Sequence, residues 1–177
     1  MALWSTPIKT VIDVILKAFS QAIPNEIPAG NNAQYGRGQI RGRWPDSKFF
    51  WENGGNTLGG WGGHYGHDGQ SALQTTTHGD CRRVPIEIEE NEGPALVRRF
   101  ELVPDSGGAG RWRGGLSTRM EVVAPMDANA FLTFDRAKFP PWGLFGGKDG
   151  MAGYGQIEVP GQPVKTVNKA YTPIPKG

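Results

Sequence analysis

The sequence predicts an α+β fold that is mostly β, with one N-terminal amphipathic helix followed by a glycine-rich, loop-heavy β domain. Apolar residues recur at helical spacing near the N-terminus, and short apolar segments typical of strands follow in the second half. Glycine (27) and proline (14) make up almost a quarter of the 177 residues, which limits regular elements to short lengths. Six tryptophans, eight phenylalanines and four tyrosines supply large side chains for packing, so the composition indicates an ordered domain.

The predicted helix covers residues 7–23. Thr6 is a good N-cap, Pro7 suits the first helical position, and Pro24 prevents continuation. The apolar stripe of this helix is broad, so we expect it to dock on the sheet of this domain or on another polypeptide. We divide the chain into an N-terminal helical arm, residues 1–28, and a β-rich module, residues 29–177.

The rest of the chain predicts short strands separated by loops. Residues 31–45 are interpreted as a loop or an irregular pair of short strands, because glycine and arginine interrupt them. Val84, Ile86 and Ile88 alternate with polar residues, which predicts a strand with Pro85 at its start or at a sheet edge and with the acidic run 87–92 on a solvated face. The other strands are expected at residues 49–52, 96–103, 117–124, 130–134, 156–159 and 164–167.

Three glycine-rich blocks, residues 54–69, 105–115 and 139–147, differ from flexible linkers. Their glycines alternate with tryptophan, arginine and proline instead of serine, which indicates ordered loops with demanding backbone geometry. The residues expected to build two of these loops are Asp105, Gly107, Gly108, Gly110, Arg111, Arg113, Gly114 and Gly115, and Pro141, Trp142 and Gly143.

Net charge, cysteine content and hydropathy argue against three classes of protein: nucleic-acid-binding, disulfide-stabilised and membrane-spanning proteins. The net charge is +2, so a general field for binding nucleic acid is not predicted, although residues 35–44 resemble arginine-glycine tracts that bind single strands. The single cysteine, Cys81, excludes an internal disulfide, and no apolar run reaches membrane-spanning length. The cytoplasm is the expected compartment, without nucleic acid or membrane as partners.

Two clusters carry side chains able to do chemistry: His64, His67 and Asp68, and then His78, Asp80 and Cys81. Both are metal-capable in residue type, but the H-x-x-H spacing within a glycine stretch does not fix two imidazoles on one face, so no metal ligand is assigned. Cys81 lacks a base fixed beside it. The candidate site-lining residues are His64, His67, Asp68 and His78.

The Arg111-Trp112-Arg113 segment offers backbone N–H groups and two guanidiniums that could cradle a phosphate or a carboxylate. The lysine and hydroxyl residues of a P-loop are missing, and arginine also stacks on tryptophan for structural reasons. A structural role is therefore favoured for this segment.

The order of these motifs resembles a known family. PIEIEENEGPALVRRFELVPDSGGAGRWRGG, followed by DRAKFPPWGLFGG, is similar to the C-terminal part of the hydantoinase B/oxoprolinase family, which includes subunits of acetone and acetophenone carboxylases. The resemblance covers nearly the whole chain from about Ile8. One departure is TTTHGDCR at residues 75–82, where the family usually has a histidine-rich H-x-H-M-T-N-T-R stretch.

The resemblance implies a heteromeric enzyme. In the family, a hydantoinase A-like subunit uses ATP to phosphorylate a carbonyl, lactam or ketone oxygen, and the B-type subunit is associated with the following step. The metal-site histidines and aspartates of carboxylase relatives lie in the N-terminal portion of the B-type subunit, expected here on a separate chain. We therefore expect no cofactor on this chain, with ATP and magnesium, and as an open alternative another divalent metal, on partner subunits.

The predicted function is that of a small subunit, a split C-terminal module inactive alone, in an ATP-dependent enzyme that acts on a small carbonyl or lactam substrate. Ketone carboxylation is favoured, because ketone carboxylases divide their machinery among more kinds of subunit. Two alternatives stay open: hydantoinase- or oxoprolinase-type ring hydrolysis, and a non-catalytic scaffold in the same complex. The expected partners are a hydantoinase A-like ATP-binding subunit and a separate N-terminal hydantoinase B-like chain.

Overall fold

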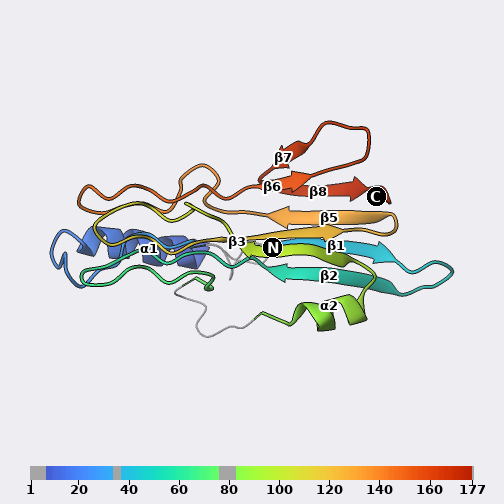
Figure 1. The fold of residues 1–177 in the computed structure, drawn as a ribbon, viewed down its shortest axis with the longest axis horizontal. Coiled ribbons are helices and arrows are strands. Elements are labelled where there is room, and N and C mark those ends of the chain that lie inside the picture. The colour runs from blue at the N-terminus through green and yellow to red at the C-terminus, as the bar shows by residue number, and fades with distance from the viewer. Residues whose placement is uncertain (1–6, 34–36, 76–82, 177) are drawn as a thin grey trace.

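A computed structural model describes residues 7–33, 37–75 and 83–176, and this part of the chain contains two helices and eight strands. The fold is α+β and mostly β, with one N-terminal helix, as predicted. Figure 1 shows an elongated molecule with the strands toward one end and long irregular segments beside the N-terminal helix at the other. In chain order the elements are α1 (Pro7–Phe19), β1 (Arg37–Arg43), β2 (Phe50–Asn56), α2 (Ile86–Glu92), β3 (Leu96–Leu102), β4 (Thr118–Val123), β5 (Ala128–Thr133), β6 (Gly155–Ile157), β7 (Lys165–Val167) and β8 (Lys169–Ile174).

The strands form one four-stranded antiparallel sheet and two ribbons. The order in the sheet is β2-β1-β5-β8, so β1 and β5 are its central strands. β3 pairs with β4, and β6 pairs with β7. Because most neighbours in the sheet are far apart in sequence, the sheet joins the two ends of the described chain.

The arginine-glycine tract forms β1, so the prediction of a loop or irregular short strands was wrong. Gly42 lies opposite Trp51, and a Cβ at Gly42 would stand 2.3 Å from the indole ring, so the glycine makes room for a buried tryptophan. On the neighbouring positions, Arg41 forms an ion pair with Glu52, and the Arg43 guanidinium lies 4.9 Å from the centre of the Phe50 ring. Cross-strand partners thus stabilise a strand that glycine content argues against.

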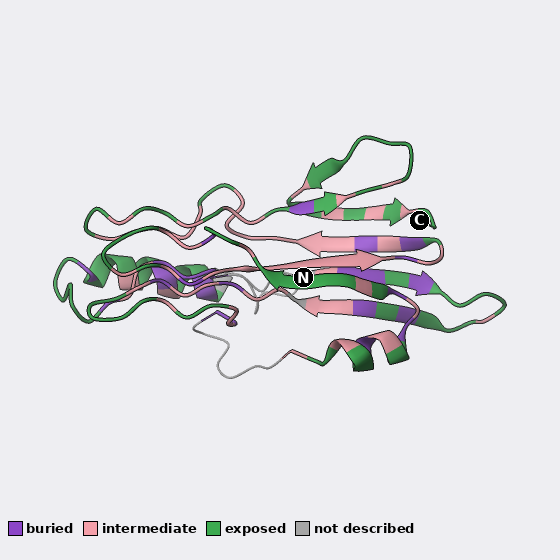
Figure 2. Ribbon diagram, viewed as in Figure 1, coloured by how far each residue is buried: buried purple, intermediate pink, exposed green. Residues whose placement is uncertain are grey.

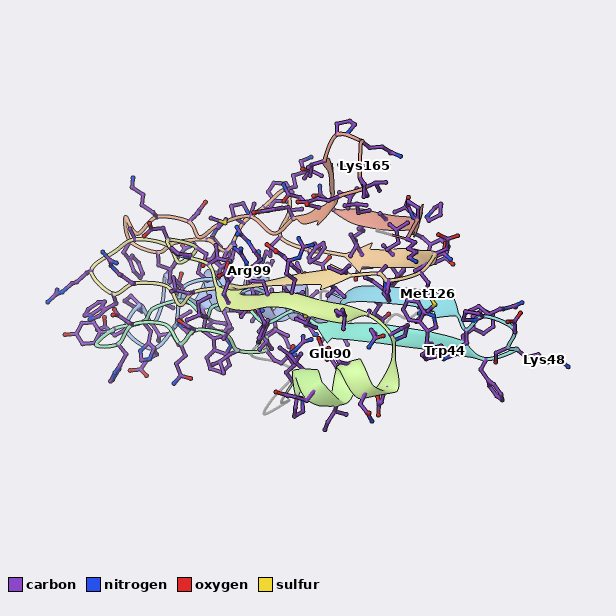
Figure 3. The ribbon with its side chains drawn as sticks, turned by 45° about the vertical axis from the view of Figure 1, so that its right-hand side comes forward. Trp44, Lys48, Glu90, Arg99, Met126 and Lys165 are labelled. Atoms are coloured by element: carbon purple, nitrogen blue, oxygen red, sulfur yellow. The ribbon has the colours of Figure 1, made fainter. Side chains whose placement is uncertain are left out.

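A small hydrophobic core joins the four-stranded sheet to the ends of the β3–β4 ribbon. Trp51 is 3% exposed and is the one large ring of this cluster. The other members are Ile40, Ala95, Ala124 and Ala128, with Val122, Met126 and Ile174 packed against them. Figure 3 shows Met126 near the strand ends of the sheet.

Residues 86–92 form the helix α2, so the strand predicted from the alternation of Val84, Ile86 and Ile88 was wrong. Glutamates are good helix formers, and Glu87 and Glu89 lie in the first turn, where the helix dipole favours negative charge. Glu89 is buried and accepts two hydrogen bonds from Arg83, at 3.0 and 2.8 Å. Glu90 accepts a hydrogen bond of 2.7 Å from the Val97 backbone, which attaches α2 to β3 (Figure 3).

The ends of the chain differ in detail from the prediction. Regular helix stops at Phe19 instead of residue 23, and hydrogen-bonded turns continue beyond it, with the Ser20 hydroxyl donating to the Lys17 carbonyl at 2.7 Å. β8 was not predicted, because it contains Pro173 and proline cannot donate a backbone hydrogen bond. Within the described residues β8 lies at the edge of the sheet and pairs with β5, and an edge strand tolerates proline. The division at residues 28 and 29 stays a prediction.

Candidate functional site

The glycine-rich blocks lie side by side and contact one another through their backbones. The Gly115 amide donates to the Trp61 carbonyl at 2.9 Å, and the Gly69 amide donates to the Arg113 carbonyl at 2.7 Å. A Cβ at Gly60 would stand 1.9 Å from the Gly115 carbonyl oxygen. These segments therefore pack at a distance that only glycine allows.

The third block joins the same bundle. The Lys148 amide donates to the Ala109 carbonyl at 2.8 Å, and the Gly30 amide donates to the Trp142 carbonyl, also at 2.8 Å. A Cβ at Gly108 would stand 2.1 Å from the Lys148 carbonyl oxygen. In Figure 1 these segments are the long traces that run beside α1, away from the sheet. We call residues 29–33, 59–73, 105–117 and 139–151 the glycine-loop bundle.

The two histidines of the H-x-x-H-D motif flank a tight turn at the surface of this bundle. The backbones of His64 and His67 exchange hydrogen bonds of 3.1 and 3.0 Å, and Gly66 supplies a φ of +88° within the turn. The two imidazole centres are 5.1 Å apart, and both side chains are exposed. The His64 Nδ1 atom lies 3.1 Å from the Tyr65 carbonyl oxygen, and both rings are accessible to a group that docks on the turn.

The turn is tied to the loop of residues 105–115 by a carboxylate and two rings. The Asp68 carboxylate accepts a hydrogen bond of 2.8 Å from the Arg113 amide. The Tyr65 ring lies 5.0 Å from Trp112, and the Arg111 guanidinium lies 4.9 Å from the centre of the same indole. Asp68 therefore positions a neighbouring loop, and Arg111 stacks on tryptophan.

α1 meets the bundle through a buried carboxylate. Asp13 is 2% exposed, forms an ion pair with Arg136, and accepts a hydrogen bond of 2.7 Å from the Trp142 indole N–H. The Asn31 amide donates to the other carboxylate oxygen at 3.3 Å. One aspartate thus joins the helix to two segments that are distant in sequence, at residue 31 and at residues 136–142.

A pocket of about 290 Å³ lies among the glycine blocks. Its volume is at the lower end for small-molecule sites, about 300–1,000 Å³. Much of its wall is glycine backbone, which offers peptide N–H and C=O groups. Large side chains, both polar and apolar, complete it: Ile27, Trp61, His64, Tyr65, Arg111, Trp112, Trp142, Leu144, Phe145 and Lys148. The pocket thus presents hydrogen-bonding groups and apolar surface together.

The structure brings three of the four candidate site-lining residues together. His64, His67 and Asp68 share one turn, whereas His78, with Asp80 and Cys81, lies outside the described residues. Within the described ranges no group of three or more histidine, cysteine, aspartate or glutamate side chains is placed to hold a metal ion. The described residues do not fit a metal centre, and the site-lining role of the histidines stays a prediction.

Sequence reasoning missed the junction at Asp13, Asn31 and Arg136. The available signal was Asp13 itself, a charged residue within the apolar pattern of a helix, because a charge in that position needs a partner when it is buried. Its partners are 18 to 129 residues away along the chain, and no local pattern indicates them.

In the described ranges, no helix combines the length and the apolar character that crossing a membrane would need.

Comparison with known proteins decides the family. The sequence model of hydantoinase B/oxoprolinase matches residues 2–177. The chain belongs to this family.

Relatives of the hydantoinase B/oxoprolinase family match by sequence and by fold. The B component of a putative D-/L-hydantoinase from Pseudomonas sp. (strain NS671) is 33% identical over 144 residues, which are 81% of this chain and 24% of the relative. The crystal structure of ATP-dependent caprolactamase from Pseudomonas jessenii superposes with a TM-score of 0.81 at 26% identity, over 98% of this chain and 31% of that chain. This chain therefore spans about a quarter to a third of these relatives.

A nucleotide-free structure of acetone carboxylase also shares the fold. Its TM-score is 0.66 at 19% identity, over 87% of this chain and 25% of that chain. At this identity the likeness concerns the fold alone. The relatives are thus parts of ATP-dependent hydrolases and carboxylases, and the family resemblance read from the motifs is confirmed.

Proposed function

We propose that this chain is a module of a B-type subunit in a multi-subunit, ATP-dependent enzyme that opens a small cyclic amide. The observation that carries the proposal is the likeness to caprolactamase, which covers 98% of this chain with a TM-score of 0.81. The lower TM-score of 0.66 for acetone carboxylase moves the preference from ketone carboxylation, favoured by subunit number, to ring hydrolysis. Ketone carboxylation is the second candidate.

The chemistry divides between this chain and its partners. The family resemblance assigns ATP, with its metal, to a hydantoinase A-like subunit, where phosphorylation of the amide oxygen makes the carbonyl carbon open to attack by water. The net reaction consumes two waters and one ATP: one water attacks the activated carbonyl carbon, the C–N bond breaks and the ring nitrogen is protonated, and the second water hydrolyses the acyl phosphate, so that the open amino acid, ADP and phosphate are released. The cytoplasm stays the predicted compartment.

The proposed contribution of this chain is the turn that carries His64 and His67. Both imidazoles are exposed beside the pocket of the glycine-loop bundle, and His64 lines that pocket. An imidazole can accept a proton from the attacking water or return one to the leaving nitrogen. The rigid backbone around the turn would hold the rings against a substrate bound between this chain and a separate N-terminal B-like chain.

The first test is purification of the chain from its native source, followed by assay of the material obtained. We expect larger companion chains of the hydantoinase A and B types, and release of ADP and phosphate on addition of hydantoin, 5-oxoproline or caprolactam. A monomer without companions contradicts the proposal. ADP release only with a ketone and bicarbonate supports carboxylation instead.

The second test separates a catalytic module from a scaffold. His64→Gln and His67→Gln are measured in the assembled complex, with mass photometry as the control for assembly. General acid–base catalysis contributes about 10²–10⁴-fold, so we expect turnover to fall by about 100-fold or more for at least one variant. Unchanged turnover in an intact complex favours the scaffold.

A further inference from the structure

The helix α1 is oriented against the usual rule for a surface helix. Its buried side chains, Lys9 and Asp13, are polar and at most 5% exposed, and Ser20 just after the helix is 3% exposed. Five of its apolar side chains, Ile8, Val11, Val14, Ile15 and Phe19, are between 47% and 60% exposed, and Ile12 and Leu16 are half-buried. Figure 2 shows most of this helix as exposed.

The contacts of Asp13 explain the buried polar face. Its carboxylate pairs with the Arg136 guanidinium and accepts hydrogen bonds from the Trp142 indole N–H and the Asn31 side-chain amide. A buried charge needs such partners, so this face of the helix turns toward the side chains that supply them. The ammonium group of Lys17 lies 5.2 Å from the Trp142 ring on the same side.

The outward face has the spacing of a helix–helix or helix–sheet interface. Ile8, Val11, Ile15 and Phe19 stand at i, i+3, i+7 and i+11, which places them on one stripe of the helix. An exposed stripe of large aliphatic side chains marks a protein interaction surface in a soluble domain. We call these four residues and Val14 the apolar face of α1.

The lengths of the relatives indicate what covers this face. The superposition on caprolactamase covers 98% of this chain and leaves only about four residues unmatched, so it includes most of α1. The matched region is 31% of that chain, so the same polypeptide supplies a further two thirds that can pack against it. We propose that the apolar face of α1 docks on the remaining part of a B-type subunit, an inference that rests on the proposed function.

The test uses two double variants with matched residues. Val11→Lys with Ile15→Lys places two charges on the apolar face, where the exposures are 55% and 47%. Val164→Lys with Ile88→Lys places two charges on the same residue types at 53% and 48% exposure elsewhere on the surface. Affinity is measured against the B-type chain that co-purifies with the wild-type protein.

We expect the α1 double variant to lose at least about 100-fold in affinity, because hot-spot positions at an interface centre tolerate charge poorly. The control double variant is expected to stay within about threefold of wild type. Equal losses in both variants, or full affinity in the α1 variant, overturn the docking surface and leave the proposed function standing. If the wild-type chain binds no B-type chain, both proposals fail.

The same variants test two other binding partners for the apolar face of α1, a second copy of this chain and a membrane surface. Light scattering of the isolated chain that gives a dimer, converted to a monomer by Val11→Lys with Ile15→Lys, assigns the face to a second copy and overturns the proposal. Co-sedimentation with phosphatidylglycerol vesicles that the same variant abolishes assigns it to a membrane surface and also overturns it.

A cross-linking measurement tests the docking surface even if the α1 double variant does not fold. p-Benzoylphenylalanine replaces Val14, 60% exposed, or Val84, 48% exposed, in the assembled complex. We expect a cross-link to the B-type chain from position 14 and a weaker one or none from position 84. Absence of the cross-link from position 14 overturns the proposal.

Discussion

The sheet half of this molecule has a hydrophobic cluster around one large ring, whereas the interior of the glycine-loop half is mainly backbone. In the sheet, Ile40 and Trp51 are buried, and Arg41 points outward to an ion pair. In the glycine-loop half, peptide groups occupy the interior, and α1 buries Lys9 and Asp13 while most of its aliphatic side chains are exposed. The same physical rule acts in both halves: an apolar surface is buried against apolar side chains, and a buried polar group is paired with a hydrogen-bonding partner.

The largest expected difference concerns ion pairs. Asp13→Ala removes one partner of a buried pair in which Arg136 is 13% exposed, so we expect a loss of about 3–5 kcal/mol in the free energy of unfolding. Glu121→Ala removes a partner of Arg99 on the β3–β4 ribbon, where the side chains are 38% and 49% exposed, and solvent screening limits the loss to below about 1 kcal/mol. Urea unfolding of the three proteins measures both losses. Similar values for the two variants would contradict the comparison.

Glycine substitutions give the next difference. In Gly60→Ala the new methyl group meets the Gly115 carbonyl oxygen at 1.9 Å, and the backbone must move, so we expect a loss of about 3 kcal/mol. Gly38→Ala in β1 meets only the Leu132 side chain at 3.9 Å, and we expect a change within about 1 kcal/mol. Thermal unfolding followed by circular dichroism compares them. A loss below about 1 kcal/mol for Gly60→Ala would mean that the backbone around Gly115 moves at little cost, and would contradict the prediction.

The smallest expected loss of stability comes from alanine at two glycines with positive φ, one in each half, and we expect the same loss at both. Gly66 in the histidine turn has a φ of +88°, and Gly161 beyond β6 has a φ of +75°, with no atom within 4 Å of an added Cβ in either case. Only backbone strain acts there, so alanine at each position is expected to cost about 1–2 kcal/mol. Differential scanning calorimetry of both variants measures the cost. A much larger loss at Gly66 would indicate packing that the turn does not show.

Local patterns predicted the elements whose neighbours in sequence decide their structure. Pro7 and the helical spacing of apolar residues marked α1, and the strands around residues 96–103 and 117–124 follow from alternation and turn residues. Short patterns failed where tertiary partners decide. Gly42 lies in a strand opposite Trp51, which fills the space that a Cβ would need, and α2 is held by the Asn53 side-chain amide, which donates to the Glu89 carbonyl.

The candidate site was predictable in part. The motif His64, His67 and Asp68 was visible in the sequence, but its attachment to Arg113 and Trp112 requires two segments about 45 residues apart to meet. The glycine content pointed to close backbone packing without naming the contacts, because any glycine permits close approach and only the fold selects the carbonyl that uses it.

The family, the mostly β fold and the need for glycine in the three blocks follow from the sequence alone, because motif order and residue type carry that information. Which face of α1 is buried depends instead on the surface that the helix packs against. Helical periodicity identifies an apolar stripe, and it predicts the buried face only when the neighbouring surface is apolar. Here the neighbouring surface offers side-chain donors, among them the Trp142 indole N–H, to the buried Asp13, so the stripe faces outward.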